Sequence, residues 1–178
     1  MNKQNTLDKI DAVALATRTL AMTSGVERNS ALRSFIEQLQ KRSSEIFSAN
    51  KKDLEQAQSD NVEASLIKRL KFDQAKLSDV IKGIETLIAM DDPIGSIDLK
   101  TELDDGLILE RVTVPIGVIA VIFESRPDAL PQIAALALKS ANGALLKGGR
   151  EALTTNTVIF EIFTSAIGSV LPAMAQSY

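Results

Sequence analysis

The first ninety residues carry apolar side chains at helical spacing, which predicts a helical half of the molecule. We expect Ser24 and Gly25 to interrupt the first helix, and the segment 26–58 to form one long helix or two abutting helices. Asp73 suits the N-cap of a helix that ends near Met90. The apolar positions that carry this pattern are Leu7, Ile10, Val13, Ala14, Leu20, Leu77, Ile81, Ile84 and Ile88.

Most charges in this half, including those of Lys51, Lys52 and Asp53, are interpreted as a solvated helix face, because charged side chains are rarely buried.

The pattern changes at residues 91–95, where an Asp-Pro pair and a glycine are helix breakers. Apolar residues then alternate with polar ones from Ile97 to Leu103, which predicts a strand. The sequence Asp104-Asp105-Gly106 is typical of a hairpin turn, and 107–114 is the expected return strand, which Pro115 ends. A β-hairpin is therefore predicted.

Two continuous apolar runs follow, at 117–123 and 144–146, and such runs are typical of parallel strands buried on both faces. The segment 128–142 between them predicts an apolar helix with Asp128 as N-cap, Pro131 in its first turn and Asn142-Gly143 as its stop. Together they predict a right-handed βαβ unit. A further helix is expected over 154–167, with Gly168 closing it. The chain then ends where a third strand is expected.

Composition fits one ordinary soluble α/β domain, with 178 residues of which 45% are hydrophobic. The net charge is −3 and the basic residues are scattered, so we expect no nucleic-acid partner. No apolar run approaches the roughly 20 residues that span a bilayer. The first twenty residues lack the apolar core of a signal peptide. We expect a cytoplasmic protein without a membrane partner.

Cysteine and histidine are both absent from the chain. Their absence excludes thiolate chemistry, disulfides, a Ser-His-Asp triad and a zinc site of the usual ligands within these residues, so no metal site is expected. Any chemistry here must use carboxylates, lysines, hydroxyls, backbone groups or a cofactor.

Two loops follow the expected parallel strands, at 124–128 and 147–151, and ligands of open α/β sheets bind at that end of the strands. No G-x-G-x-x-G sequence is present. The segment 143–148 has the first half of a P-loop spacing but lacks the Lys-Ser/Thr pair that holds phosphate and magnesium. A Walker-type NTPase is therefore not expected.

The residues of these loops leave two interpretations open. Lys147 and Arg150 could grip a phosphate beside two glycines, or the loop could be a tight turn with a solvated arginine. Arg126 and Asp128 could contact a substrate, or Asp128 could cap its helix with Arg126 as a local partner.

Three long segments, 114–128, 134–143 and 145–149, resemble the gamma-glutamyl phosphate reductase family nearly residue for residue. Upstream, 49–54 and 90–95 are similar to the same family, so the resemblance extends over essentially the whole chain. The family belongs to the aldehyde dehydrogenase superfamily.

The resemblance implies the amino-terminal part of an aldehyde-dehydrogenase-like three-layer α/β fold. Its expected parts are a helical lead-in at 1–92, a β-hairpin at 93–116, and an incomplete Rossmann-like unit with the first βαβ at 117–178. The implied activity is NADPH-dependent reduction of L-glutamyl 5-phosphate to L-glutamate 5-semialdehyde, a step of proline biosynthesis. A homo-oligomer is implied for the full-length enzyme.

By position, the resemblance implies that Ile122, Phe123, Glu124 and Ser125 line the nicotinamide side of the cofactor. The resemblance also places Lys147 at the adenosine ribose or its 2′-phosphate, with Gly148, Gly149 and Arg150 beside it.

Some positions depart from the superfamily pattern. Ser125 stands where many relatives have an oxyanion-binding asparagine, so Ser125 and Arg126 are candidate oxyanion or substrate contacts. The acid that follows the lysine in NAD-preferring relatives is here Glu151, displaced by one residue and preceded by Arg150, which favours NADPH.

The family's cysteine nucleophile lies outside these residues, so the chain alone is expected to be inactive. The alternative interpretation is a non-catalytic dinucleotide-binding or assembly module.

Overall fold

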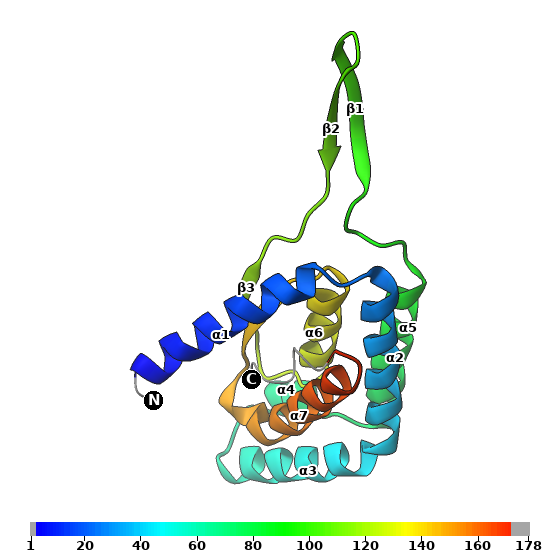
Figure 1. Cartoon of the computed structure of the whole chain (residues 1–178). Coiled ribbons are helices and arrows are strands. Elements are labelled where there is room, and N and C mark those ends of the chain that lie inside the picture. The colour runs from blue at the N-terminus through cyan, green and yellow to red at the C-terminus, as the bar shows by residue number, and fades with distance from the viewer. Residues whose placement is uncertain (1–2, 172–178) are drawn as a thin grey trace.

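The computed structural model describes residues 3–171, and the tail beyond Leu171 lies outside this range. A helical region comes first, then a projecting hairpin, and then a short parallel sheet with its helices (Figure 1). The elements are α1 (Lys3–Ala21), α2 (Gly25–Lys41), α3 (Ser43–Ser59), α4 (Ala64–Leu70), α5 (Gln74–Ala89), β1 (Ile97–Asp104), β2 (Leu107–Val112), β3 (Val118–Ile122), α6 (Ala129–Lys139), β4 (Gly143–Lys147), the 3-10 turn η1 (Arg150–Ala152) and α7 (Leu153–Val170).

Ser24 interrupts the helical half as expected and also caps the next helix, which was not predicted, whereas the cap at Asp73 was. The Ser24 hydroxyl accepts a hydrogen bond from the Glu27 amide at 3.2 Å, and the Glu27 carboxylate accepts one from the Ser24 amide at 2.7 Å. This reciprocal capping box starts α2. Asp73 caps α5 by accepting from the Lys76 amide at 3.1 Å. The segment 26–58 forms two abutting helices, α2 and α3, with Arg42 between them.

One hydrophobic core joins the helical half to the sheet region, with members from α2, α5, α6 and α7. At its centre the rings of Phe35 on α2 and Phe163 on α7 meet edge to face, with centroids 5.0 Å apart. The two halves of the sequence therefore fold around a shared core rather than as separate lobes.

Strands β1 and β2 form an antiparallel hairpin that extends away from the helices (Figure 1). Gly106 turns the chain with a φ of +74°, which confirms the expected turn. The return strand ends at Val112 rather than at residue 114. All residues of both strands are exposed, so the hairpin is held by its own ladder and by its base.

A buried cluster of charged side chains anchors the base of the hairpin. Arg28 on α2, only 1% exposed, pairs with Asp92 at 2.7 Å and donates to the backbone oxygen of Lys139 at 3.2 Å. The Lys139 ammonium group, at the end of α6, in turn donates to the Met90 backbone oxygen at 2.8 Å and to the Asn29 side chain at 3.0 Å. The linker before β1 is thereby tied to both α2 and α6.

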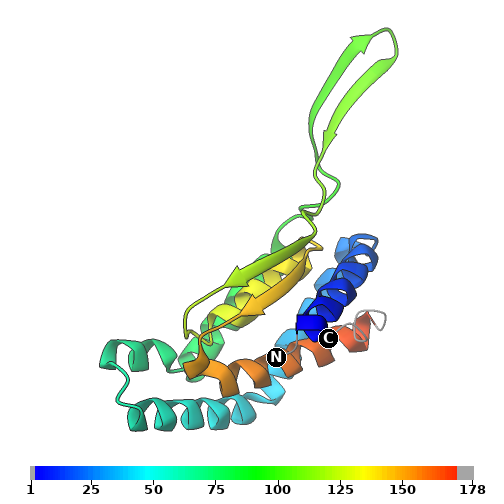
Figure 2. The same ribbon diagram turned by 90° about the vertical axis from the view of Figure 1, so that its left-hand side faces the viewer.

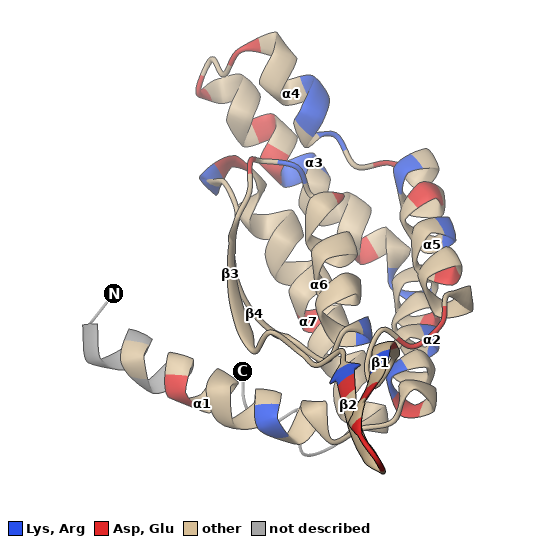
Figure 3. Cartoon of the chain, turned by 90° about the horizontal axis from the view of Figure 1, so that it is seen from above, with Lys and Arg blue, Asp and Glu red and all other residues tan. Residues whose placement is uncertain are grey.

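Strands β3 and β4 are parallel and are joined through α6, which confirms the βαβ unit (Figure 2). Their register runs from Val118 opposite Gly143 to Ile122 opposite Lys147. On one side of the sheet lie α6 and α7, while α1 contacts the Gly143 end (Figure 3).

The prediction that both parallel strands are buried on both faces is wrong. Residues 143–146 of β4 are only half-buried, and β3 is more exposed still. Val118, Ala120 and Ile122 are exposed and alternate with the half-buried Ile119 and Val121. The physical reason is that the described helices cover only one side of the strand along most of its length.

Two smaller expectations are also wrong. The Asp128 carboxylate makes no capping hydrogen bond to α6, because its oxygens face Arg126 and Lys76 instead. Gly168 does not end α7, which continues to Val170. A glycine within a helix weakens it but does not stop it where the helix is packed, and the neighbouring Ala166 and Ile167 are buried in the core.

Within residues 3–171, every helix is too short or too polar to cross a membrane.

Candidate functional site

The loops that follow β3 and β4 meet side by side at one end of the sheet. The Phe123 amide donates to the Lys147 backbone oxygen at 3.0 Å, which extends the parallel ladder by one step. Beyond it, the Ser125 hydroxyl donates to a carboxylate oxygen of Glu151. The fold thus brings together the two sets of residues that the sequence marks as candidates.

Both glycines of the second loop are required by this close approach. A Cβ at Gly149 would overlap the Ser125 hydroxyl, and a Cβ at Gly148 would lie 2.6 Å from the Asn156 side-chain nitrogen and 3.1 Å from the Phe123 ring. The packing of the protein itself therefore already accounts for the two glycines. The predicted role of admitting a ligand close to the backbone stays a prediction.

The Glu151 carboxylate is stabilised in its charged form. Its hydrogen bond from Ser125, followed by its own backbone amide and the nearby Arg150 guanidinium, lowers the pKa of Glu151 below its ordinary value of 4.5. Since Ser125 donates its proton to Glu151, its hydroxyl is oriented by protein rather than left free for a substrate. The candidate oxyanion role of Ser125 stays a prediction.

The loop after β3 is held by ion pairs to the helical half. Glu124 pairs with Arg69 of α4 at 3.0 Å, and both side chains are exposed. Asp128 pairs with Arg126 at 3.0 Å and lies 3.4 Å from the Lys76 ammonium of α5. The Asp128 carboxylate raises the pKa of Arg126 above its ordinary value. Arg126 is therefore the local partner of Asp128, although the helix cap that the same interpretation assigned to Asp128 does not form.

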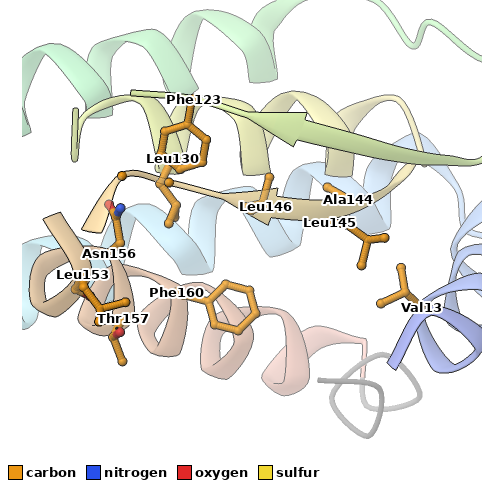
Figure 4. Close-up of a pocket in the computed structure, with 12 residues that line it drawn as sticks. Val13, Phe123, Leu130, Ala144, Leu145, Leu146, Leu153, Asn156, Thr157 and Phe160 are labelled. Carbon is orange, nitrogen blue, oxygen red and sulfur yellow. Dashed lines mark hydrogen bonds between the residues drawn. The ribbon is translucent and has the colours of Figure 1, made fainter. Parts of the chain in front are cut away.

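A cavity of about 390 Å³ opens beneath the second loop, between β4 and the first turns of α7 (Figure 4). Its walls are mostly apolar, and Phe123, Leu153 and Phe160 contribute to them. Asn156 lies in the wall and is only 8% exposed, yet its side-chain oxygen accepts no hydrogen bond from any described residue. A buried acceptor of this kind is uncommon in a folded protein.

Cationic side chains stand at the rim of the loop. Lys147 ends β4, Arg150 begins η1, and both are exposed. Within residues 3–171 neither of them is in an ion pair, so both are available to an anionic group from outside. Ile122, at the end of β3, is 78% exposed and presents an apolar surface beside them.

The amino terminus of α7 is occupied by a carboxylate from another helix. Asp53 of α3 accepts from the Thr154 amide at 3.1 Å, from the Thr155 amide at 2.8 Å and from the Thr155 hydroxyl at 2.6 Å. Asp53 is only 6% exposed. The interpretation of Asp53 as part of a solvated face is wrong, whereas Lys51 and Lys52 are exposed as expected.

Three buried polar residues around this region were not found by reasoning from sequence: Asn50, Asp53 and Asn156. For the first two a signal exists, because residues 46, 49, 50, 53 and 57 form one stripe of a helix and this stripe is otherwise apolar. Polar residues within an apolar stripe are buried and need partners. The same signal exists for Asn156, because it shares one stripe of its helix with the apolar, buried residues Ile159, Phe163 and Ile167.

No protein-family model matches the chain. The curated gamma-glutamyl phosphate reductase of Acetivibrio thermocellus is 50% identical over 155 residues, which are 87% of this chain and 36% of that protein. The chain thus spans little more than a third of the length of such relatives.

Solved structures also show similarity to gamma-glutamyl phosphate reductases. The gamma-glutamyl phosphate reductase of Thermotoga maritima superposes with a TM-score of 0.91 at 36% identity, over 96% of this chain and 41% of that one. The enzyme of Saccharomyces cerevisiae has a TM-score of 0.90 at 34% identity, over 99% and 45% of the two chains. The propionaldehyde dehydrogenase of Rhodopseudomonas palustris, at 14% identity and a TM-score of 0.58 over 91% and 34%, shares the fold alone.

Sequence and fold agree: over most of its length the chain is homologous to the amino-terminal part of gamma-glutamyl phosphate reductases, and it has the fold of the corresponding part of aldehyde dehydrogenases.

Proposed function

We propose that this chain forms the dinucleotide-binding side of a reductase that converts L-glutamyl 5-phosphate to L-glutamate 5-semialdehyde, with NADPH as its cofactor. The observation that carries the proposal is the meeting of the loops after β3 and β4, which places Phe123, Ser125, Lys147 and Arg150 at one end of a parallel sheet. Ligands of open α/β sheets bind at this end. Similarity to proteins named gamma-glutamyl phosphate reductase supports the choice of substrate.

The residues present fit a dinucleotide. The apolar cavity beneath the second loop suits a planar ring, and the unpartnered oxygen of Asn156 offers an acceptor to it. Lys147 and Arg150 at the rim are unpaired cations within the described part of the chain and suit a phosphate. We favour the 2′-phosphorylated cofactor because the carboxylate of Glu151, which would repel that phosphate, is turned toward Ser125.

When bound, the cofactor supplies the hydride that reduces the acyl group. The chain's own contribution is to bind and orient. Ile122 and Phe123 offer apolar surface to the cofactor, and Glu151 holds the Ser125 loop against the Lys147 loop. The chain contains no cysteine, so a thiol nucleophile must come from outside these 178 residues.

The absence of a nucleophile also favours a second candidate function, a dinucleotide-binding or assembly module that is not catalytic by itself. The two functions differ in what the chain does when the rest of the enzyme is supplied.

A chimeric enzyme distinguishes the two candidate functions. The matched 155 residues of the Acetivibrio thermocellus reductase are replaced by the corresponding part of this chain, and NADPH oxidation is followed with L-glutamyl 5-phosphate generated in the assay. We expect turnover that depends on the acyl phosphate. A folded chimera that binds NADPH but does not turn over would contradict the reductase function and favour the module.

A further inference from the structure

We propose that Asp53, on α3, is the positioning residue of the cofactor loop: it fixes the start of α7 and thereby holds residues 147–151 in the shape that binds the dinucleotide. The inference rests on the proposed function for its ligand, and on hydrogen bonds of the described chain for its geometry.

The first step concerns the amino terminus of α7. The first amides of a helix have no partner within the helix and favour an anion. Here the Asp53 carboxylate takes the amides of Thr154 and Thr155, at 3.1 and 2.8 Å, and comes from 101 and 102 residues away in the sequence. Within the described residues Asp53 has no ion pair, so these amides and the Thr155 hydroxyl are its partners.

The second step concerns the support of Asp53 itself. Asn50, one turn earlier on α3, donates to the Thr155 hydroxyl at 3.2 Å and to the Leu70 backbone oxygen at 2.9 Å. The Asn50 side-chain oxygen accepts from the Phe72 amide at 2.8 Å. The Thr155 hydroxyl thus accepts from Asn50 and donates to Asp53, and all three side chains are buried. This network connects α3, the link between α4 and α5, and α7.

The third step connects the network to the loop. Ala152 ends η1, immediately before α7, and packs with Ala57 of α3 in a small apolar cluster in which it is fully buried. Glu151, one residue earlier, holds Ser125 of the neighbouring loop. With residues 152–155 fixed by α3 and residue 147 fixed by the sheet, the segment between them has little freedom left.

The same geometry implies that the cofactor phosphates bind away from the start of α7. Because the carboxylate of Asp53 occupies the amides at the start of α7, a cofactor phosphate cannot use them without displacing a buried charge. The exposed side chains of Lys147 and Arg150 are left as the phosphate contacts.

The test compares Asp53→Asn with the wild-type chain and with Glu55→Gln, which neutralises an exposed carboxylate of the same helix. Hydrogen exchange is measured by residue, and NADPH affinity by calorimetry. Asp53→Asn removes the charge and turns one acceptor oxygen into a donor, so we expect exchange of the amides in 148–155 to accelerate about tenfold, with α5 unchanged. NADPH affinity is expected to fall with it, while Glu55→Gln matches the wild type.

Thr155→Val is the milder second variant, since it removes one of the three hydrogen bonds of Asp53 and keeps the volume of a fully buried side chain. Thr155→Val should change hydrogen exchange in 148–155 and NADPH affinity in the same direction as Asp53→Asn, but by less. Unchanged protection in 148–155, or a loss of protection spread evenly over the chain, would overturn the proposal, as would altered protection with unaltered NADPH affinity. If the wild type binds no NADPH, the proposed cofactor site fails, and the local exchange pattern alone then decides whether Asp53 positions the loop.

Discussion

Arg28 and Asp92 form an ion pair in which one guanidinium nitrogen lies 2.7 Å from each of the two carboxylate oxygens. The arginine is buried and the aspartate is partly exposed, so the pair sits at the boundary between the core and the base of the hairpin. Gly25 is required beside it, because a Cβ there would overlap the Asp92 carboxylate. The segment 91–95 was predicted only as a break between helix and strand. Through Asp92 it also anchors the base of the hairpin to α2.

Removing the carboxylate should destabilise the chain more than an ordinary surface change. Asp92→Ala leaves the buried charge of Arg28 without its anion, and we expect a loss of about 2 kcal/mol in the free energy of unfolding. Denaturant unfolding measures this loss. Asp91→Ala, which removes an exposed neighbouring carboxylate, should cost less than about 0.5 kcal/mol. Equal effects of the two substitutions would contradict the anchor.

The hydrogen bond from Ser125 to Glu151 predicts that the stability of the folded chain depends on pH. Because the pKa of Glu151 is lowered in the folded chain, its contribution to stability is present above the ordinary value of 4.5 and is lost as the pH falls through the lower, folded-state value. Ser125→Ala removes the largest cause, so the pKa of Glu151 should rise toward 4.5. A carbon-detected NMR titration of the glutamate carboxyl groups measures it. Ser59→Ala, at an exposed serine, should leave it unchanged.

Lys147 should decide which dinucleotide the chain prefers. It is an exposed cation without an ion pair among residues 3–171, so it can contact the 2′-phosphate that distinguishes NADPH from NADH. Calorimetric titrations of Lys147→Ala are expected to show affinity for NADPH about tenfold weaker and affinity for NADH little changed. Lys82→Ala, which removes an exposed charge of α5, is the matched control. Equal affinities for both cofactors in all variants would show that the loop is only a turn.

The chain alone should have no reductase activity, because it contains neither cysteine nor histidine. NADPH oxidation with L-glutamyl 5-phosphate made in the assay, and the reverse reaction with the semialdehyde, should both stay at the level of a boiled control. Turnover that persists through repurification would refute this expectation.

Local patterns predicted most of the fold. The helix break at Ser24, the cap at Asp73, the turn at Gly106 and the two apolar runs each depend on neighbours in sequence, so a window of a few residues contains the information. The short helix α4 was not predicted. It has seven residues, too few for a helical period to stand out.

The features that were not predicted from the sequence depend on contacts between residues that are far apart along the chain. Asp53 looks like a surface charge until α7 is placed against α3, about a hundred residues later. Asp128 looks like an N-cap until Lys76 and Arg126 are seen to face it. The two loops of the candidate site were predicted from strand order alone, whereas the contact that joins them, from Ser125 to Glu151, required the backbone geometry at Gly149.

The outer edge of β3 is the remaining exposed surface with a physical consequence. The Gly117 oxygen and the Phe123 amide both bond to β4, so by the alternation of a strand the backbone groups of Val118, Ala120 and Ile122 point away from it. These three residues are also exposed, and the outer edge thus combines apolar side chains with backbone groups that have no sheet partner within residues 3–171. Such edges pair with other chains.

We therefore predict self-association of the chain through β3, or marginal stability of the segment after Gly117 relative to the helical half. Light scattering over a concentration series measures the first, and hydrogen exchange the second. Ala120→Lys places a charge on the exposed face and should reduce association, as charged residues do on natural edge strands. Leu136→Lys, at an exposed apolar position of α6, removes apolar surface but leaves the edge intact and should have a smaller effect. A strict monomer with strong protection throughout 117–146 would mean that the chain closes its own core and that the edge of β3 is not adhesive.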